Sequence, residues 1–162
     1  MPLEIERKFL VSSSAWRGSA ERSERMRQRY FGGTERCSIR VRIAGPSSWL
    51  NIKSRLAGPT RLEYEYPIPL EDAEDMLERL CVGASIDKIR HFVPCEGHTF
   101  EVDEFLGPNA GLVVAEIELD AADASFPRPA WLGAEITDDE RYYNFNLARH
   151  PWPAWSGEAA AQ

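Results

Sequence analysis

The sequence has few of the residues that build disulfide frameworks or zinc sites. Its 162 residues include three cysteines and three histidines, and neither set has metal-site spacing. Because the number of cysteines is odd and no CxxC pair occurs, we expect Cys37, Cys81 and Cys95 to be reduced thiols. Neither a zinc module nor a disulfide-stabilised scaffold is indicated.

The chain also lacks an excess of positive charge and any long hydrophobic run. Lysine and arginine number 19 against 26 acidic residues, so the formal net charge is -7. Nonspecific nucleic-acid binding depends on basic surface, so we expect no nucleic-acid partner. Because no apolar run approaches the length of a membrane span and no secretory signal pattern occurs, we expect no membrane association and a cytoplasmic location.

The composition is that of a globular protein. A hydrophobic content of 43% in 162 residues can supply a substantial core. We predict one domain over residues 1–150 and a C-terminal tail over 151–162. The prolines of the tail cannot continue a helix, Trp152 and Trp155 are expected to dock on the domain, and residues 156–162 are expected to be disordered.

Alternation of apolar and polar residues predicts eight β-strands. Turn sequences such as Gly32-Gly33 and Gly58-Pro59 separate them. Eight strands with mostly short connections indicate an antiparallel barrel or sandwich, in an α+β but mainly β fold. The predicted strands are 3–11, 25–31, 36–43, 48–55, 61–68, 86–93, 99–106 and 112–120.

Two segments have the period of a helix instead. Residues 70–81 carry an apolar stripe opposite acidic residues, as a helix covering a sheet would. The sequence Thr137-Asp138-Asp139-Glu140 has the capping-box pattern and predicts a helix through Leu147. A short helix at 13–17 is a weaker prediction, and the proline-containing stretch 123–133 is predicted to be an ordered loop.

Glu4, Glu6 and Lys8 alternate with apolar residues near the N-terminus. On a strand they would share one face, about 7 Å between neighbours. Carboxylates beside an ammonium suit a divalent metal next to a phosphate, because oxygen ligands hold hard cations and lysine meets the phosphate charge. The alternative interpretation is an ordinary exposed strand with surface charges.

The same spacing of charges recurs along the chain and decides between these interpretations. Solvated surface pairs would contribute little to stability, and a soluble surface usually intersperses the two signs. Here cations dominate some strands and carboxylates dominate others, which favours a charged barrel interior that binds a polyanion and its metals. The pairs are Arg40/Arg42, Lys53/Arg55, Glu63/Glu65, Lys88/Arg90, Glu101/Asp103 and Glu116/Glu118.

The run Glu4-Ile5-Glu6-Arg7-Lys8 matches the ExExK signature of the CYTH superfamily, the triphosphate tunnel metalloenzymes. The later charged pairs resemble the successive strands of that family, and Trp131-Leu132-Gly133 with Arg141-Tyr142-Tyr143-Asn144 resembles the closing segment of its small bacterial members. The resemblance extends to about Arg149. It implies an eight-stranded antiparallel tunnel with a few covering helices and metal-dependent chemistry on triphosphates.

Resemblance and charge together suggest roles for the charged residues. Mg²⁺ or Mn²⁺ is the expected cofactor, and a small-molecule triphosphate is the expected substrate. The expected metal ligands are Glu4, Glu6, Asp103, Glu116 and Glu118. The expected substrate-binding residues are Lys8, Arg40, Arg42, Lys53, Arg55, Lys88, Arg90 and Tyr30. For catalysis we expect Glu116 or Glu118 to orient a water and Lys8 or Lys53 to stabilise transferring charge.

The leading functional hypothesis is a metal-dependent hydrolase that cleaves a phosphoanhydride bond, with inorganic triphosphate as the favoured substrate. The alternatives are a class IV-type adenylate cyclase, a thiamine triphosphatase and a non-catalytic polyphosphate-binding module. Glu63 and Glu65 either contact metal or only pair with arginines, and Tyr30 is either a gate or a packing aromatic. The oligomeric state is open, with a homodimer as one option.

One residue departs from the family pattern. Many bacterial relatives have Gln-Gly-Tyr in the second strand, where this chain has Gln28-Arg29-Tyr30. Because side chains alternate across a strand, we expect Arg29 to point out of the tunnel. A bulge at that position would instead bring it to the tunnel mouth.

Overall fold

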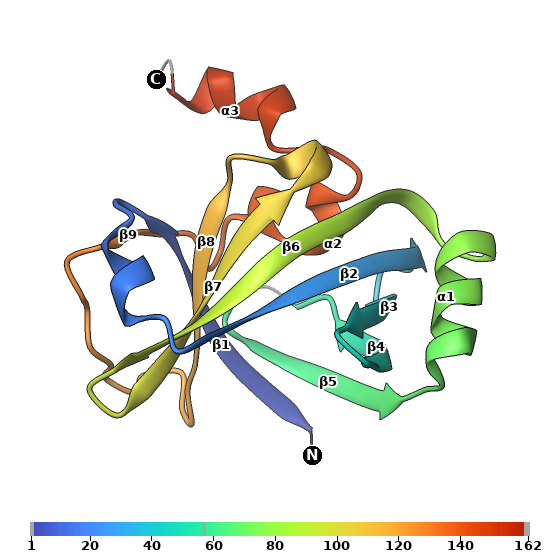
Figure 1. Cartoon of the computed structure of the whole chain (residues 1–162), viewed down its shortest axis with the longest axis horizontal. Coiled ribbons are helices and arrows are strands. Elements are labelled where there is room, and N and C mark those ends of the chain that lie inside the picture. Colours follow the sequence, from blue (N-terminus) through green and yellow to red (C-terminus); the bar gives the residue numbers. More distant parts are fainter. Residues whose placement is uncertain (1, 57, 161–162) are drawn as a thin grey trace.

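A computed structural model describes residues 2–56 and 58–160. In this part of the chain nine strands form one sheet, and eight of them curl into a barrel (Figure 1). The strands are β1 (Leu3–Val11), β2 (Arg22–Gly33), β3 (Cys37–Ala44), β4 (Ser47–Ser54), β5 (Thr60–Pro67), β6 (Val82–Cys95), β7 (His98–Leu106), β8 (Val113–Glu118) and β9 (Leu132–Glu135).

Strand β1 closes the barrel because it pairs with both β5 and β8. Its first residues pair with β5, where Leu3 lies opposite Leu62, and its later residues pair with β8, where Lys8 lies opposite Glu116. The strand order is therefore β5-β4-β3-β2-β6-β7-β8-β1 and back to β5, with every pairing antiparallel. The predicted eight-stranded antiparallel barrel is confirmed.

The ninth strand was not predicted. Residues 132–135 pair with the end of β1, where β5 has already diverged, so the last part of the predicted loop 123–133 is a strand. Gly133 permits the close approach, because a Cβ there would lie 2.9 Å from the carbonyl oxygen of Leu10. Strands β2 and β6 are also longer than predicted at both ends.

Two apolar clusters cover the outside of the barrel. Helix α1 (Leu70–Arg79) places Ala73 and Leu77 against Val41 and Ile43 of β3, as its apolar stripe predicted. On another side, Trp16 from the short 3₁₀ helix η1 (Ala15–Ser19) joins outward-facing residues of β1, β7 and β8. With their outer faces buried in this way, these strands turn their charged faces inward.

The C-terminal segment supplies a third cluster, at one end of the barrel. The predicted helix from Thr137 is broken into 3₁₀ helix η3 (Glu140–Tyr142) and α2 (Asn144–Leu147). Thr137 does not cap a helix, because its hydroxyl accepts from the Lys8 amide at 3.0 Å and donates to Glu135 at 2.6 Å. The segment is thereby tied to β1, and Phe145 packs with Tyr30 inside the barrel end.

The tail is more ordered than predicted. Residues 153–160 form helix α3 (Pro153–Ala160), at the top of Figure 1, so the prediction of disorder from residue 156 is wrong as far as residue 160. Proline at the first helical position suits a helix start. Trp152 and Trp155 pack on the C-terminal cluster, which confirms the expected docking. Residues 161–162 lie outside the described residues.

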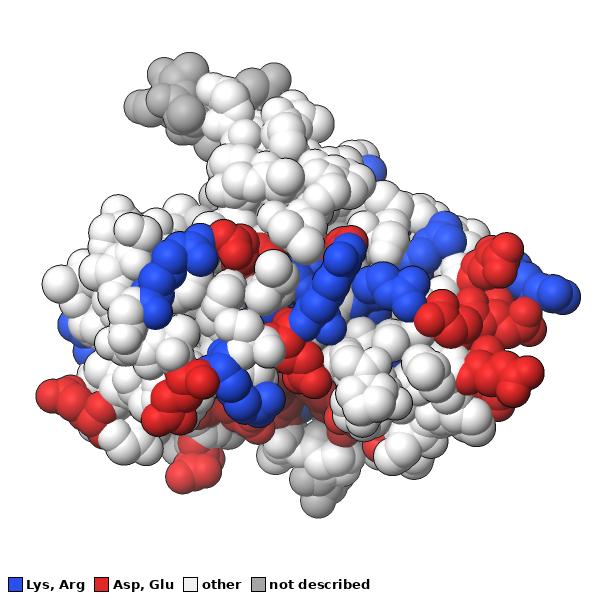
Figure 2. Space-filling view, in the orientation of Figure 1, with Lys and Arg blue, Asp and Glu red and all other residues white. Residues whose placement is uncertain are grey.

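The outer surface carries both signs of charge in close proximity. Figure 2 shows Lys and Arg side chains beside Asp and Glu across one face, with acidic residues gathered over α1. Several of these are ion pairs, such as Arg25 with Asp87 and Arg27 with Glu74, each at 2.7 Å. None of the helices within residues 2–56 and 58–160 combines the length and the apolarity that a membrane crossing requires.

Candidate active site

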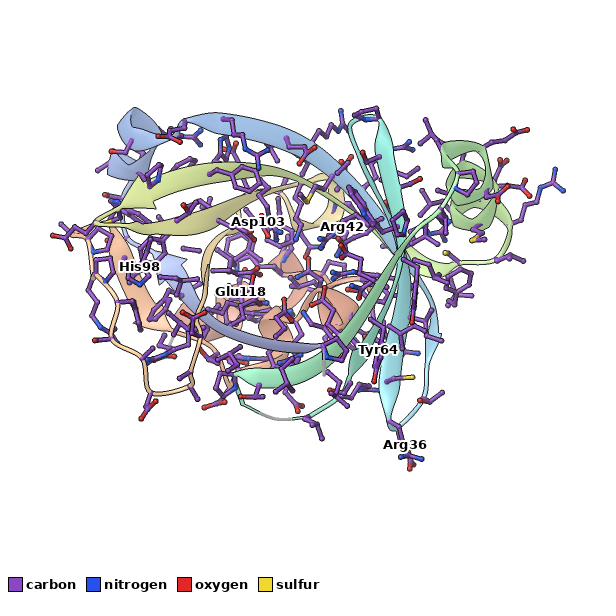
Figure 3. The ribbon with its side chains drawn as sticks, turned by 90° about the horizontal axis from the view of Figure 1, so that it is seen from below. Arg36, Arg42, Tyr64, His98, Asp103 and Glu118 are labelled. Atoms are coloured by element: carbon purple, nitrogen blue, oxygen red, sulfur yellow. The ribbon has the colours of Figure 1, made fainter. Side chains whose placement is uncertain are left out.

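The inner faces of the strands enclose a cavity of about 570 Å³. In Figure 3 the side chains of Arg42, Asp103 and Glu118 lie within the ring of strands, whereas Arg36 and His98 lie at its margin. All predicted site residues except Asp103 line the cavity: Glu4, Glu6, Lys8, Tyr30, Arg40, Arg42, Lys53, Arg55, Lys88, Arg90, Glu116 and Glu118. The inward interpretation of the charged faces is therefore the one that the structure adopts.

The charged strands are sorted into two halves of the wall. Neighbouring strands β4, β3, β2 and β6 carry most of the cations, including Arg40, Arg42 and Lys88. Strands β7, β8, β1 and β5 are also neighbours and carry most of the carboxylates, including Glu6 and Glu116. An anion with a bound metal cation could therefore face arginine and lysine on one side and carboxylates on the other.

Asp103 is the exception to the predicted metal ligands. One carboxylate oxygen accepts from Arg90 Nε at 2.8 Å, and the other accepts from Lys88 Nζ at 2.7 Å and Arg90 Nη2 at 2.9 Å. Its side chain is fully buried and does not line the cavity. Burial opposes ionisation, but Arg90 and Lys88 outweigh it and lower the pKa of Asp103. The carboxylate holds two cations in place and has no oxygen turned to a ligand.

Lys88 lies almost completely buried at the back of the cavity. Its side chain is 1% exposed, between Asp103 and the amide oxygen of Asn144. Burial, which disfavours the ammonium form, lowers its pKa to about 7 although Asp103 acts in the opposite direction. A buried ammonium of this kind gains most from a further anion.

Two carboxylates of the acidic half lie beside the same cation. Lys53 Nζ lies 2.7 Å from Glu4 Oε2 and 3.8 Å from Glu63 Oε2. Burial opposes ionisation of Glu4, but Lys53 and a hydrogen bond with Glu63 outweigh it and lower the pKa of Glu4 to about 2. Burial and the same hydrogen bond raise the pKa of Glu63 to about 7. The two pKa values shift in opposite directions, so Glu63 holds a proton more readily than Glu4.

Glu6 and Glu116 fit a divalent metal by their chemistry. Burial and the neighbouring Glu116 raise the pKa of Glu6 well above its usual value, so a divalent cation beside the two carboxylates would favour the ionised form of Glu6. Among the described residues no group of three His, Cys, Asp or Glu is arranged as a metal cage. A site of few carboxylates suits Mg²⁺ or Mn²⁺, since Mg²⁺ keeps several waters and is completed by substrate phosphates.

Two arginines of β3 line the cavity and keep N–H donors available for a ligand. Within the described residues Arg40 Nε is buried and has no hydrogen-bond partner. Arg42 donates through Nε to Gln28 at 2.8 Å, and burial together with Arg40 and Arg90 lowers the pKa of Arg42 to about 10. Unpaired guanidinium donors in a buried cavity call for an anion with several acceptor oxygens.

Sequence reasoning missed the contribution of the C-terminal segment. Tyr143 lies in the cavity wall with the Arg61 guanidinium 4.4 Å and the Lys8 ammonium 5.5 Å from its ring centre. Asn144 contacts Lys88, as described above. The period of two on β5 could have identified Arg61, since it shares a face with Glu63; no local pattern could have placed Tyr143 or Asn144 in the barrel.

Tyr30 and Arg55 are held by Phe145. The Tyr30 ring is buried and meets the Phe145 ring edge to face at 5.2 Å between ring centres, so packing rather than gating describes it. The Arg55 guanidinium lies 4.8 Å from the centre of the Phe145 ring and donates to the Thr34 carbonyl at 3.0 Å. Gly33 leaves the room for this ring, because a Cβ there would lie 2.5 Å from it.

Arg29 lies outside the barrel, as alternation predicted. Its guanidinium donates to the carbonyl oxygens of Leu77 at 2.8 Å and Gly83 at 2.7 Å. It therefore links the last turn of α1 to the start of β6. The cavity does not include it.

Comparison with known proteins agrees with this geometry. The model of the CYTH domain matches residues 2–148. The chain belongs to the CYTH domain family. The match spans the barrel and α2, and it ends before α3.

The curated relatives of this CYTH protein include two inorganic triphosphatases. The protein from Acetivibrio thermocellus is 45% identical over 152 residues, which cover 94% of this chain and 97% of the relative. The protein from Nitrosomonas europaea is 36% identical over 151 residues, which cover 90% of this chain and 96% of the relative. Both matches run over nearly the full length of both proteins.

Solved structures extend the comparison to the fold. The crystal structure of the inorganic triphosphatase NE1496 matches with a TM-score of 0.66 and 33% identity, over 90% of this chain and 93% of the other. HpAC1 from Hippeastrum, a protein with a dominant triphosphatase activity, matches with a TM-score of 0.58 over 73% and 80% of the two chains. At 15% identity this second match shows a shared fold alone.

Proposed function

We propose that this CYTH protein is a metal-dependent inorganic triphosphatase, which adds water to triphosphate and releases pyrophosphate and phosphate. The observation that carries the proposal is the division of one barrel cavity into a cationic half and an acidic half. The two near full-length relatives named inorganic triphosphatase support the same activity. CYTH triphosphatases depend on metals in general, and we propose Mg²⁺ or Mn²⁺ here.

The cationic half would bind the phosphate chain. Arg40 offers its unpaired Nε and Arg42 its terminal nitrogens, while Lys88 provides a point charge at the back of the cavity. Arginine forks match phosphate oxygens, and phosphoryl transfer needs positioned positive charge more than covalent help. Lys8 and Lys53, which lie beside acidic partners, would stabilise charge that moves onto the departing phosphate.

The acidic half would hold the metal and orient the attacking water. We assign Glu4, Glu6 and Glu116 to the metal, which when bound would neutralise phosphate charge and supply coordinated water. We do not assign Asp103 to the metal, because its carboxylate oxygens accept hydrogen bonds from Lys88 and Arg90. Glu118 lines the cavity and has no ion-pair partner among the described residues, so its carboxylate is free to accept a hydrogen bond from water.

The proposal is tested by phosphate release from inorganic triphosphate, ATP and thiamine triphosphate with Mg²⁺ or Mn²⁺. We expect metal-dependent release, fastest from inorganic triphosphate, and loss of release on chelation. Arg42→Met should abolish most activity, whereas Arg25→Met, in an exposed pair with Asp87, should not. Folded protein that releases no phosphate from any of the three contradicts the proposal, and cyclic AMP formed from ATP would favour the cyclase alternative.

A further inference from the structure

Asn144 stands where two chains of hydrogen bonds meet. Its Oδ1 accepts from the Lys88 ammonium at 3.1 Å and from Gln28 Nε2 at 3.4 Å. Gln28 is fully buried, and its own Oε1 accepts from Arg42 Nε at 2.8 Å. One amide oxygen of α2 is thereby connected to a cation of β6 directly and to a cation of β3 through one residue.

The contact with Asn144 helps to orient the Lys88 ammonium. An ammonium has three N–H donors, and two of them are used by Asp103 and Asn144. Fixing two donors of a tetrahedral group fixes the third, which is the one left for a ligand in the cavity that Lys88 lines. In the same way, a bond at Arg42 Nε orients the plane of the guanidinium and leaves its terminal nitrogens free.

The side chain of Asn144 is uncharged, and this matters as much as its position. Asp103 already offsets part of the positive charge of Lys88 and Arg90, so a second carboxylate at position 144 would offset more of the charge that a phosphate requires. A neutral amide orients the ammonium and leaves its charge for the ligand. The adjacent Tyr143 likewise contacts two cations, Lys8 and Arg61, through an uncharged ring.

We propose that Asn144 is a positioning residue for catalysis, which aims Lys88 and, through Gln28, Arg42 at the transferring phosphate. This inference rests on the proposed triphosphatase function and deepens it. It makes α2 part of the phosphate-binding machinery instead of a cover over the barrel end. Only its side-chain oxygen is required for the role.

A purely structural role for Asn144 would be the anchoring of α2, and the protein has another anchor for that purpose. Asn109 is buried outside the cavity, where its Nδ2 donates to the Leu147 carbonyl at 3.3 Å and its Oδ1 accepts from the Trp152 amide at 2.8 Å. It holds the same C-terminal segment and contacts none of the cavity cations. Asn109→Ala is therefore the matched control.

The test compares three variants by steady-state kinetics on inorganic triphosphate and by melting temperature. Asn144→Leu keeps the volume but removes the acceptor, and we expect kcat to fall about tenfold or more, since misdirected positioning groups cost that much. Asn144→Asp keeps the acceptor, so it should recover part of kcat while raising KM through repulsion of the substrate. Asn109→Ala should lower the melting temperature and leave kcat unchanged.

Three results would overturn the inference. One is an Asn144→Leu protein with kcat and KM within about twofold of the wild type. Another is an Asn144→Asp protein whose kcat is no higher than that of Asn144→Leu. The third is an Asn109→Ala protein that loses as much kcat as Asn144→Leu when the two melting temperatures fall by the same amount.

Failure of the proposed function is distinguishable from failure of this inference. If the wild type hydrolyses no triphosphate, the melting temperature with and without triphosphate reports binding alone, because a ligand stabilises the state that binds it. A smaller stabilisation of Asn144→Leu than of the wild type then supports the positioning role without hydrolysis. Equal stabilisation of the two proteins, or none of the wild type, overturns it.

Discussion

The Lys88 ammonium lies 2.7 Å from Asp103 Oδ2, and both side chains are withdrawn from solvent, at 1% and 0% exposure. Arg90 Nε lies 2.8 Å from Oδ1 of the same carboxylate. Two cations of β6 thus share one carboxylate of β7, and Arg90 also pairs with Glu101 at 2.8 Å and with Glu116 at 3.3 Å. A buried charge without a partner is costly, so this cluster links the stability of the barrel to the order of its phosphate-binding face.

Asp103→Asn should therefore destabilise the protein by about 3 kcal/mol or more, because it leaves Lys88 and Arg90 buried with too little negative charge. Urea unfolding measures this cost. Asp87→Asn, in the exposed pair with Arg25, should cost less than about 1 kcal/mol. If Asp103→Asn instead left stability intact and raised the metal concentration needed for half-maximal activity, Asp103 would be a metal ligand.

Glu6→Gln and Glu63→Gln should have different effects on metal dependence. Glutamine at position 63 keeps a hydrogen-bonding side chain beside Glu4 and removes no proposed ligand, so half-maximal activity should need nearly the same metal concentration. Glutamine at position 6 removes a proposed ligand and should raise that concentration about tenfold. Metal titrations of activity test both variants. Equal effects of the two changes would place Glu63 in the metal site.

Arg29→Ala should lower stability without lowering activity. The change removes two hydrogen bonds from a charged group to backbone carbonyls, which contribute about 1 to 3 kcal/mol in similar cases. The melting temperature should then fall by about 2 to 4 °C per kcal/mol. Arg27→Ala, which breaks only an exposed pair with Glu74, is the control and should have a smaller effect. Reduced kcat in Arg29→Ala would mean that Arg29 acts on the tunnel.

Glu135→Gln should destabilise the protein in a pH-dependent way. The hydrogen bond from Arg7 lowers the pKa of Glu135 in the folded protein. A carboxylate with a lowered folded pKa contributes stability above its unfolded value, and the contribution is lost as pH falls through the folded value. The loss at pH 7 should be at most about 1 kcal/mol, since the pair is partly exposed, and it should decline below pH 4.5. Unfolding curves at neutral and acid pH measure it; a pH-independent loss would count against the pair.

Local sequence predicted the barrel and most of its charged lining because both follow from the period of two. The side chains of Glu4, Glu6 and Lys8 share a face whatever the strand pairs with, so the alternation places them together. The same rule sends Arg29 outward. The capping-box prediction at Thr137 was wrong because a neighbouring strand competed for its hydroxyl.

The sequence by itself determined which strands are cationic and which are acidic. The tertiary structure alone decided that the cationic strands are neighbours, that Asp103 serves Lys88 and Arg90, and that Asn144 reaches the cavity. The reason is physical: alternation is a property of each strand, whereas strand order and the docking of a distant segment depend on contacts between residues far apart in the chain.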